Sequence, residues 1–420
     1  MKIPFSPPYI DDDVISEVAD ALRSGWITTG PKVKLLEEEV EKLLSTEACC
    51  AVNSWTSGAI LALKWLGLRP NDEVIVPAYT YCATAMAVIE AGCKPVMVDI
   101  KEDMTIDENQ LLNAITPKTK AIIPMDIGGF PCNYHRIKEI INLPEITKIY
   151  TPYTDNQRVL NRIMLLSDSA HSIGAKINGQ SVANYVDIAV LSFHAVKNIT
   201  SAEGGMICLN LPSPFNNREL KKWFKIMSLN GQTKDAFAKM QNAGWRYDVV
   251  DMGLKINMPD VNAAIALAQI RKYDYLLHER KRVFDRYNSC LQRFKWAILP
   301  FQTDKSPKKN SPSAVRCPIS DIENVYHLYP LRISDMSSVQ RDRLITELAE
   351  RGIATNVHYI PLPELTLFKK MGFQISDYPI ANKVFEHEIT LPLYPQLTDG
   401  QVDFILENLI AVHDYIVSNT

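Results

Sequence analysis

The feature that most constrains the fold is an alternation of short apolar runs with helix-like segments, from about residue 45 to residue 210. The runs are rich in β-branched residues, as in DEVIVPAY, KPVMVDI, KAIIPMDIGG, RIMLLSDSA, VDIAVLSFHA and GGMICLN. Short apolar strands separated by helices predict an α/β fold, in which helices cover both faces of a mostly parallel sheet. Ligands bind such sheets at the carboxyl ends of the strands. Polar residues that directly follow a strand are therefore candidates for a functional site.

The pattern changes after residue 258. A long helical stretch, residues 259–291, is followed by the strand YHLYPLRI, an amphipathic helix that ends at Gly352, and a final helix over TDGQVDFILENLIAVHDYIV. A chain of 420 residues is also too long for one ordinary domain. We therefore predict a large domain over residues 1–270 and a smaller α+β domain over residues 271–420. Residues 143–162 show no clear period and are interpreted as an insertion, which either shapes a nucleotide pocket or only the surface.

Composition excludes several classes of protein. The formal net charge is -3, from 45 basic and 48 acidic side chains, so nothing favours binding to nucleic acid or to an anionic membrane. No apolar run has the length of a signal peptide core or of a membrane-spanning helix, so we expect a cytoplasmic protein. The eight cysteines include no CxxC pair, and they are interpreted as buried hydrophobic residues. We expect no metal site.

The stretch LSFHAVKNITSAEGGMI places one lysine, Lys197, between two apolar runs, a few residues after Ser192. A buried lysine is costly unless its charge is paired or removed. A Schiff base with a carbonyl cofactor removes the charge and makes the lysine a catalytic group. The alternative is a lysine that simply reaches solvent.

A second candidate is LLSDSAHSIGA, in which Asp168 follows an apolar strand and His171 comes three residues later. A carboxylate at the end of a strand is not needed for packing, so it is available to a ligand. The alternative is that Asp168 caps a helix.

Two further junctions carry polar or aromatic groups. In NSWTSGAILAL, the hydroxyls of Thr56 and Ser57 and nearby backbone N–H groups suit a phosphate, although such residues also cap helices. In VPAYTYCAT, Tyr79 and Tyr81 follow a strand, where a ring can stack on a flat cofactor or belong to the core or surface.

Together these four features match the needs of pyridoxal phosphate. That cofactor requires a lysine for its aldehyde, a carboxylate for its pyridine nitrogen, a ring to stack on and donors for its phosphate. Competing signatures are missing, since the sequence contains neither a G-x-G-x-x-G turn nor a G-x-x-x-x-G-K-[ST] loop.

The chain resembles the sugar aminotransferases of the DegT/DnrJ/EryC1/StrS family. The resemblance rests on SFHAVKNITSAEGGMI, DSAHSIGA, NSWTSGAILAL, VPAYTYCAT, NMPDVNAAIALAQI and LPLYPQLTDGQVDFI, and it runs in order over nearly the whole chain. It implies a fold-type I pyridoxal phosphate enzyme, usually a homodimer with shared active sites. Trp55 and Leu254 depart from the family pattern. A dehydratase branch carries histidine in place of Lys197, so the lysine favours transamination.

Matched by motif, the resemblance implies that Lys197 is the Schiff-base lysine and proton carrier, and that Asp168 pairs with the pyridine nitrogen. His171 would lie on the side of the phenolic oxygen, and Tyr81 would stack on the ring. The implied phosphate ligands are Thr56, Ser57 and Ser192, with Lys255 or Asn257 reaching the site of the neighbouring subunit. The implied sugar-binding residues are Trp26, Thr28, Thr29, His358 and Tyr359.

We therefore expect an aminotransferase that uses L-glutamate to aminate a nucleotide-linked keto-sugar, with the 4-keto-6-deoxy type favoured. Its product would enter surface polysaccharide, lipopolysaccharide, glycan or antibiotic sugar synthesis. Within the enzyme class, a 3-keto-sugar, a cyclitol or an aminobenzoate precursor remains an alternative. Outside that class, the chain is either a metal-dependent protein that uses Asp168, His171 and His194 or a non-catalytic binder.

Overall fold

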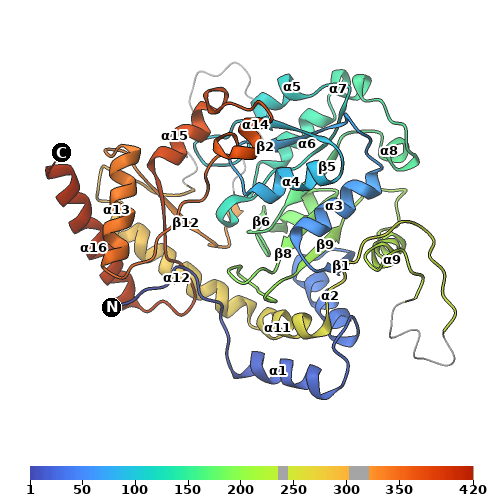
Figure 1. Cartoon of the computed structure of the whole chain (residues 1–420), viewed down its shortest axis with the longest axis horizontal. Helices are drawn as coiled ribbons and strands as arrows, with labels where there is room; N and C mark the ends of the chain where they lie inside the picture. The colour runs from blue at the N-terminus through green and yellow to red at the C-terminus, as the bar shows by residue number, and fades with distance from the viewer. Residues whose placement is uncertain (235–244, 302–320, 420) are drawn as a thin grey trace.

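The computed structural model describes residues 1–234, 245–301 and 321–419, and a seven-stranded sheet forms its centre (Figure 1). In spatial order the strands are β1 (Ala48–Val52), β9 (Gly205–Leu209), β8 (Ile188–Ser192), β5 (Met164–Asp168), β4 (Thr119–Ile122), β2 (Glu73–Pro77) and β3 (Lys94–Val98). Neighbouring strands from β8 to β3 are parallel, whereas β9 is antiparallel to both β1 and β8. The prediction of an α/β fold with a mostly parallel sheet is confirmed.

Helices cover both faces of this sheet, because successive side chains of each strand point to opposite faces. In β1, Cys49 and Ala51 join a core with α2 (Pro31–Leu44), α6 (Tyr134–Ile141) and α11 (Asp260–Ile270). The other residues of the same strand join a second core with α3 (Trp55–Leu66) and α4 (Cys82–Glu90). This double coverage explains why the strands are apolar at consecutive positions.

The remaining elements lie around these layers. They are α1 (Asp12–Arg23), α5 (Leu111–Ala114), α7 (Pro144–Ile149), α8 (Asp155–Leu160), α9 (Asn217–Met227), β6 (Lys176–Ile177), β7 (Gln180–Ser181) and β11 (Ile322–Glu323). None of the described helices combines the length and apolarity that crossing a bilayer requires.

The helical stretch predicted over residues 259–291 is helical with one interruption, and it forms two helices, α11 and α12 (Tyr273–Leu291). The break falls at Lys272, whose ammonium forms ion pairs with Asp11 and Asp13 of the N-terminal segment. No glycine or proline lies at or beside this break, so no local signal in the sequence marks it.

The C-terminal part forms a separate antiparallel sheet of β10 (Ala297–Ile298), β12 (Tyr329–Ile333) and β13 (Glu388–Leu391). α13 (Ser338–Glu350) and α16 (Asp399–Ser418) pack on it around a core of its own, and the short helices α14 (Thr366–Lys370) and α15 (Pro379–His387) lead back toward the large sheet (Figure 1). α12 contributes to this C-terminal core and also to the core that contains α2, α6 and α11. The division into residues 1–270 and 271–420 stays a prediction.

The proposed insertion at residues 143–162 contains α7 and α8 and packs on the C-terminal end of α3. The side chains of Thr154 and Gln157 donate to the carbonyl of Leu66, at 3.0 Å and 3.1 Å. No residue of this segment lines the cavity described below.

The interpretation of the cysteines holds for five of the eight, which are buried, and is wrong for Cys82 and Cys290, which are half-buried. Cys317 lies outside the described residues.

Candidate active site

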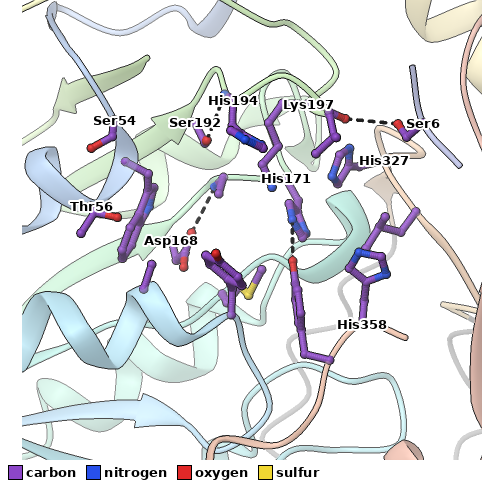
Figure 2. A pocket seen from close by; sticks show the side chains of 18 of the residues that line it. Ser6, Ser54, Thr56, Asp168, His171, Ser192, His194, Lys197, His327 and His358 are labelled. Carbon is purple, nitrogen blue, oxygen red and sulfur yellow. Dashed lines mark hydrogen bonds between the residues drawn. The ribbon is translucent and has the colours of Figure 1, made fainter. Parts of the chain in front are cut away.

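A cavity of about 400 Å³ opens at the carboxyl ends of β5 and β8, beside the first turn of α3 (Figure 2). This volume falls in the range of small-molecule sites, roughly 300–1,000 Å³. The cavity brings together nine of the candidate residues named from the sequence: Thr56, Tyr81, Asp168, His171, Ser192, His194, Lys197, His358 and Tyr359.

Lys197 lies in the loop that connects β8 to β9. Asn198 and Thr200 anchor this loop, because Asn198 Nδ2 donates to the carbonyl of Val325 at 2.7 Å and the Thr200 N–H donates to Gln269 Oε1 at 2.9 Å. Lys197 Nζ donates no hydrogen bond to any described residue, and the side chain is half-buried in the cavity wall. Burial lowers the pKa of this amine to about 8, although the nearby Asp168 carboxylate acts in the opposite direction.

Asp168 ends β5, next to β8 in the sheet, which places its carboxylate beside the Lys197 loop. Thr84 Oγ1 donates to Oδ2 at 2.7 Å, and the Ala170 N–H donates to Oδ1 at 3.2 Å. Burial raises the pKa of this carboxyl to about 6, and the two hydrogen bonds and Lys197 limit the rise. No helix directly follows β5 in this described part of the chain, so the interpretation of Asp168 as a helix cap is wrong.

His171 and Tyr359 form a hydrogen-bonded pair whose direction is fixed. The backbone N–H of Gly128 donates to His171 Nδ1 at 3.1 Å, so this nitrogen carries no hydrogen. Burial holds the pKa of His171 well below its usual value, with Lys197 adding to the effect, so the ring is neutral and its one hydrogen lies on Nε2. Nε2 therefore donates to Tyr359 Oη at 3.0 Å, which leaves the Tyr359 hydroxyl hydrogen for a ligand.

His358 lies beside Tyr359 on the segment that follows α13. Its backbone N–H donates to Glu388 Oε2 at 2.9 Å, and its Nδ1 lies 2.9 Å from Thr390 Oγ1, both on or beside β13. Phe5 of the N-terminal segment stacks on the ring, with the centroids 5.5 Å apart. Burial, with a contribution from Lys197, lowers the pKa of His358 to about 3, so this ring also stays neutral.

The first turn of α3 forms the end of the cavity opposite to His358. Ser54 caps the helix by accepting the Ser57 N–H at 3.1 Å, so Ser57 faces this cap and does not line the cavity. Thr56 does line it, as does Ser192 at the end of β8. Gly205 pairs with Ser192, and a Cβ at Gly205 would come within 2.6 Å of the Ser54 backbone. The glycine thus lets the start of α3 approach β8 closely enough for Thr56 and Ser192 to share one site.

Tyr81 and Tyr79 have different environments. Tyr81 is 55% exposed within the described chain, lines the cavity and lies 5.7 Å from the Tyr359 ring, centroid to centroid. Tyr79 is only 1% exposed and belongs to the core between the sheet and α3. Of these two tyrosines, Tyr81 is therefore the one whose ring can stack on a ligand in the cavity.

The other candidates from the sequence lie away from this cavity. Thr29 and Asn257 line a second cavity of about 440 Å³, where Asn257 Nδ2 donates to Thr29 Oγ1 at 2.6 Å. Lys255 is exposed and hydrogen-bonds Asn257 Oδ1. Trp26 donates to the Thr29 carbonyl at 3.1 Å, and Thr28 is exposed. Within one chain, these residues do not meet Lys197.

Several lining residues were missed from the sequence, namely Phe5, Ser6, Met125, Glu203 and His327. Phe5 and Ser6 reach the site because Ile3 pairs with Ile353 and carries the N-terminal segment across the cavity. His327 precedes β12 and was hidden within a run that predicts a strand.

His194 pairs with Glu203 at 3.6 Å, and no metal-binding group of three or more His, Cys, Asp and Glu occurs within residues 1–234, 245–301 and 321–419.

This set of side chains fits pyridoxal phosphate. An amine of lowered pKa, a buried carboxylate, an exposed ring and the N-terminus of α3 lie around one cavity. Ser54 satisfies only the Ser57 N–H, so the N–H groups of Trp55 and Thr56 stay available for an anion, together with the Thr56 and Ser192 hydroxyls.

The lowered pKa of Lys197 predicts how cofactor loading depends on pH. The neutral amine is the nucleophile, so the loading rate of the cofactor-free protein should rise about tenfold per pH unit and level off above pH 8. Stopped-flow absorbance after addition of pyridoxal phosphate measures this rate. In Asp168→Asn the plateau should begin at lower pH, because the carboxylate that raises the pKa of Lys197 is gone. A rate that keeps rising up to pH 10 would contradict the assigned environment.

Comparison with known proteins agrees with this geometry. The family model described as the DegT/DnrJ/EryC1/StrS aminotransferase family matches residues 8–150 and 157–410. The spore coat polysaccharide biosynthesis protein SpsC of Bacillus subtilis is 32% identical over 419 residues, which cover 99% of this chain and 97% of that protein.

Solved structures give the same result. Spr1654 of Streptococcus pneumoniae, described as a sugar aminotransferase, is 42% identical in its PMP form, with a TM-score of 0.91 and coverage of 99% of this chain and 100% of that one. Its PLP form is 40% identical, with a TM-score of 0.90 and the same coverage. PseC of Helicobacter pylori, at 24% identity and a TM-score of 0.82 over 99% of this chain and 100% of that one, shares the fold.

Proposed function

The chain belongs to the DegT/DnrJ/EryC1/StrS aminotransferase family and is a pyridoxal phosphate-dependent sugar aminotransferase, and from that premise we propose that it transfers an amino group from L-glutamate to a nucleotide-linked keto-sugar. A 4-keto-6-deoxy sugar is the favoured acceptor. The product would enter the synthesis of a surface polysaccharide or glycan, in keeping with the name of the relative SpsC.

One observation carries this proposal: Lys197 and Asp168 face the same cavity from neighbouring strand ends, and their pKa values are shifted toward each other, to about 8 and about 6. A lysine with a lowered pKa can exist as a free amine near neutral pH, and a buried carboxylate without a cationic partner in contact is available to a cationic ring. Strongly shifted groups in one cavity are typical of a catalytic site.

When bound, pyridoxal phosphate supplies an aldehyde that bonds to amines and a ring that withdraws electrons from the carbon under reaction. Lys197 would take a proton from the carbon of the amino donor and return one to the carbon of the sugar. Asp168 would hold a proton on the pyridine nitrogen. The Tyr359 hydroxyl, oriented by His171, would donate to an oxygen of the substrate.

The remaining residues would bind and orient. Thr56 and Ser192 hydroxyls would hold the phosphate together with the first N–H groups of α3, and Tyr81 would cover the face of the ring. Ser57 would act on the phosphate only through Ser54, to which it is hydrogen-bonded. His358 would contact the sugar from the side of the cavity where Phe5 holds its ring.

The experiment that tests the proposal measures the two half-reactions separately. The pyridoxamine form of the enzyme is mixed with UDP-, dTDP- and GDP-linked 4-keto-6-deoxyhexoses and with a 3-keto-sugar, and the absorbance of the aldehyde form is followed. Amination of a 4-keto-sugar supports the proposal. If only the 3-keto-sugar reacts, the acceptor is a 3-keto-sugar and not a 4-keto-sugar. If none of the nucleotide-linked sugars reacts, the proposed substrate class is refuted.

We also propose that the active protein is a homodimer whose sites are shared. Lys255 and Asn257 hydrogen-bond each other near Thr29, outside the cavity that contains Lys197 of the same chain. The exposed ammonium of Lys255 and the amide of Asn257 suit a phosphate oxygen presented by a second copy. Trp26, Thr28 and Thr29 belong to the same N-terminal segment, which contacts Asn257 through Thr29. They would complete the sugar site of that second copy.

Mixing of two inactive variants tests this arrangement. Lys197→Ala is combined with a chain that carries both Lys255→Ala and Asn257→Ala, and subunit exchange is verified by mass. Each heterodimer would contain one doubly impaired site and one intact site, so activity should return to about half of that of wild type per heterodimer, if sites act independently. Verified exchange without recovery, or an active monomer in sedimentation, would contradict shared sites.

A further inference from the structure

His327 is a buried histidine that lines the cavity and takes no part in the functions proposed above. It precedes β12, and its ring centroid lies 4.2 Å from that of His171. Figure 2 shows His327 on the same side of the cavity as Lys197 and His171, away from Thr56. Its position is therefore where a substrate, and not the phosphate, would meet it.

The hydrogen bonds around His327 determine which nitrogen carries its hydrogen. Asn198 Nδ2 donates to the carbonyl of Val325 at 2.7 Å, which fixes the orientation of the amide. Asn198 Oδ1 is then an acceptor, so His327 Nδ1, 2.9 Å away, must donate to it. Burial, followed by the charges of His171 and Lys197, holds the pKa of His327 well below its usual value, so the ring is neutral.

A neutral imidazole that carries hydrogen on Nδ1 has a lone pair on Nε2 and can only accept there. Nδ1 is occupied by Asn198, so Nε2 is the nitrogen left to meet a ligand in the cavity. It does not compete with His171, whose Nε2 hydrogen goes to Tyr359. The cavity thus presents an acceptor at His327 and a donor at Tyr359.

The two substrates differ in what they offer to an acceptor. A sugar presents several hydroxyl hydrogens. Glutamate presents two carboxylates, which are acceptors only, and its amine is the group that reacts. A lone pair on His327 Nε2 therefore suits a sugar and opposes a carboxylate.

We propose that His327 Nε2 accepts a hydrogen bond from a hydroxyl group of the sugar, and that His327 thereby favours binding of the sugar over binding of the amino acid in the cavity that both substrates use. This inference rests on the proposed function, because it presupposes that a sugar is the amino acceptor. It assigns to His327 a contact with the substrate, whereas Asn198 is a positioning residue that fixes its tautomer.

Two matched variants separate this contact from a structural role. In His327→Asn the amide nitrogen takes the place of Nδ1 and can still donate to Asn198, but the acceptor at Nε2 is lost. In His327→Gln the amide oxygen reaches the place of Nε2, and the bond to Asn198 is lost. Thermal melting with and without cofactor verifies that each variant is folded.

The test uses the holoenzyme and the keto-sugar that wild type aminates fastest in the panel above. In His327→Asn, KM for the sugar should rise about tenfold with kcat nearly unchanged, while the glutamate half-reaction stays within about twofold. His327→Gln should recover most of the loss. Among singly deoxygenated analogues of the sugar, one should bind wild type more weakly but bind His327→Asn no worse than the parent sugar does.

The opposite results overturn the inference. Equal losses in both half-reactions, or a shifted pH profile of cofactor loading, would show that His327 only supports the Lys197 loop through Asn198. An unchanged sugar half-reaction in His327→Asn would show that the sugar makes no such contact. If wild type aminates no sugar, the proposed function fails first and this inference falls with it, so the two failures are distinguishable.

Discussion

Replacement of Lys197 by alanine should abolish turnover while leaving the fold intact. The residue is expected both to bond to the cofactor and to move the proton in each half-reaction, and loss of a positioned proton carrier alone costs on the order of 10²–10⁴-fold in rate. We therefore expect a loss of at least about 10⁴-fold in kcat for Lys197→Ala. Coupled assay of sugar amination measures it, and the cofactor should remain bound but dissociate faster.

Lys197→Arg is the matched control, because it keeps a positive charge beside Asp168 but stays protonated and cannot act as an amine nucleophile. It should be as inactive as Lys197→Ala. Added ethylamine should restore part of the activity of Lys197→Ala, which has space at the cavity wall, but none to Lys197→Arg. Turnover within tenfold of wild type in either variant would remove Lys197 from the mechanism.

Asp168→Asn should lower the rate of both half-reactions on the order of 10²–10³-fold, because an amide cannot hold a proton on the pyridine nitrogen, and loss of one preorganised electrostatic group has effects of this size. Single-turnover absorbance measurements with glutamate and with the keto-sugar give the two rates. Near-normal single-turnover rates would show that Asp168 has no such role.

The stability of the cofactor-free protein provides an independent check on Asp168. Burial raises the pKa of this carboxyl from its usual 3.8 to about 6 in the folded state, so its ionisation destabilises the fold progressively as pH rises between these values, and the full penalty remains above pH 6. At pH 8, Asp168→Asn without cofactor should melt at the same temperature as wild type or higher. A large drop in melting temperature would attribute the loss of rate to misfolding.

The centre of the site could be predicted from the sequence because strand ends bring distant residues together. β5 and β8 are adjacent and parallel, with Asp168 opposite Val190, so residues that follow the two strands meet at one edge. The same rule places Tyr81 after β2 and Thr56 after β1. Predicting that these residues lie together required only the order of strands and helices, and no knowledge of side-chain packing.

Residues that depend on long-range packing could not be predicted in this way. Phe5 and Ser6 reach the cavity through the pairing of Ile3 with Ile353, and no local sequence pattern predicts this pairing. His327 lies in an apolar strand-like run, and only the folded structure places its ring in the wall of the cavity, beside Asn198. The break between α11 and α12 falls in a stretch without glycine or proline, so helix propensity does not mark it.

Thr84, which holds the Asp168 carboxylate in place, could not be predicted from the sequence either. It lies on the apolar helix α4, where a threonine reads as a core residue, yet its hydroxyl donates to the Asp168 carboxylate at 2.7 Å. Thr80 Oγ1 in turn lies 2.8 Å from Thr84 Oγ1, so a short chain of hydroxyls orients the carboxylate. The sequence identifies the acid, but the partners that hold it in place become visible only when α4 is packed beside β5.

The most direct test of the account is to identify the lysine that bonds to the cofactor. The holoenzyme is reduced with borohydride, digested, and its peptides are analysed by mass spectrometry for the added phosphopyridoxyl group. The account predicts that the label lies on Lys197, within the peptide that contains SFHAVKNITSAEGG, and that prior exposure to L-glutamate prevents labelling. A label on any other lysine, or none on a fully loaded protein, would contradict it.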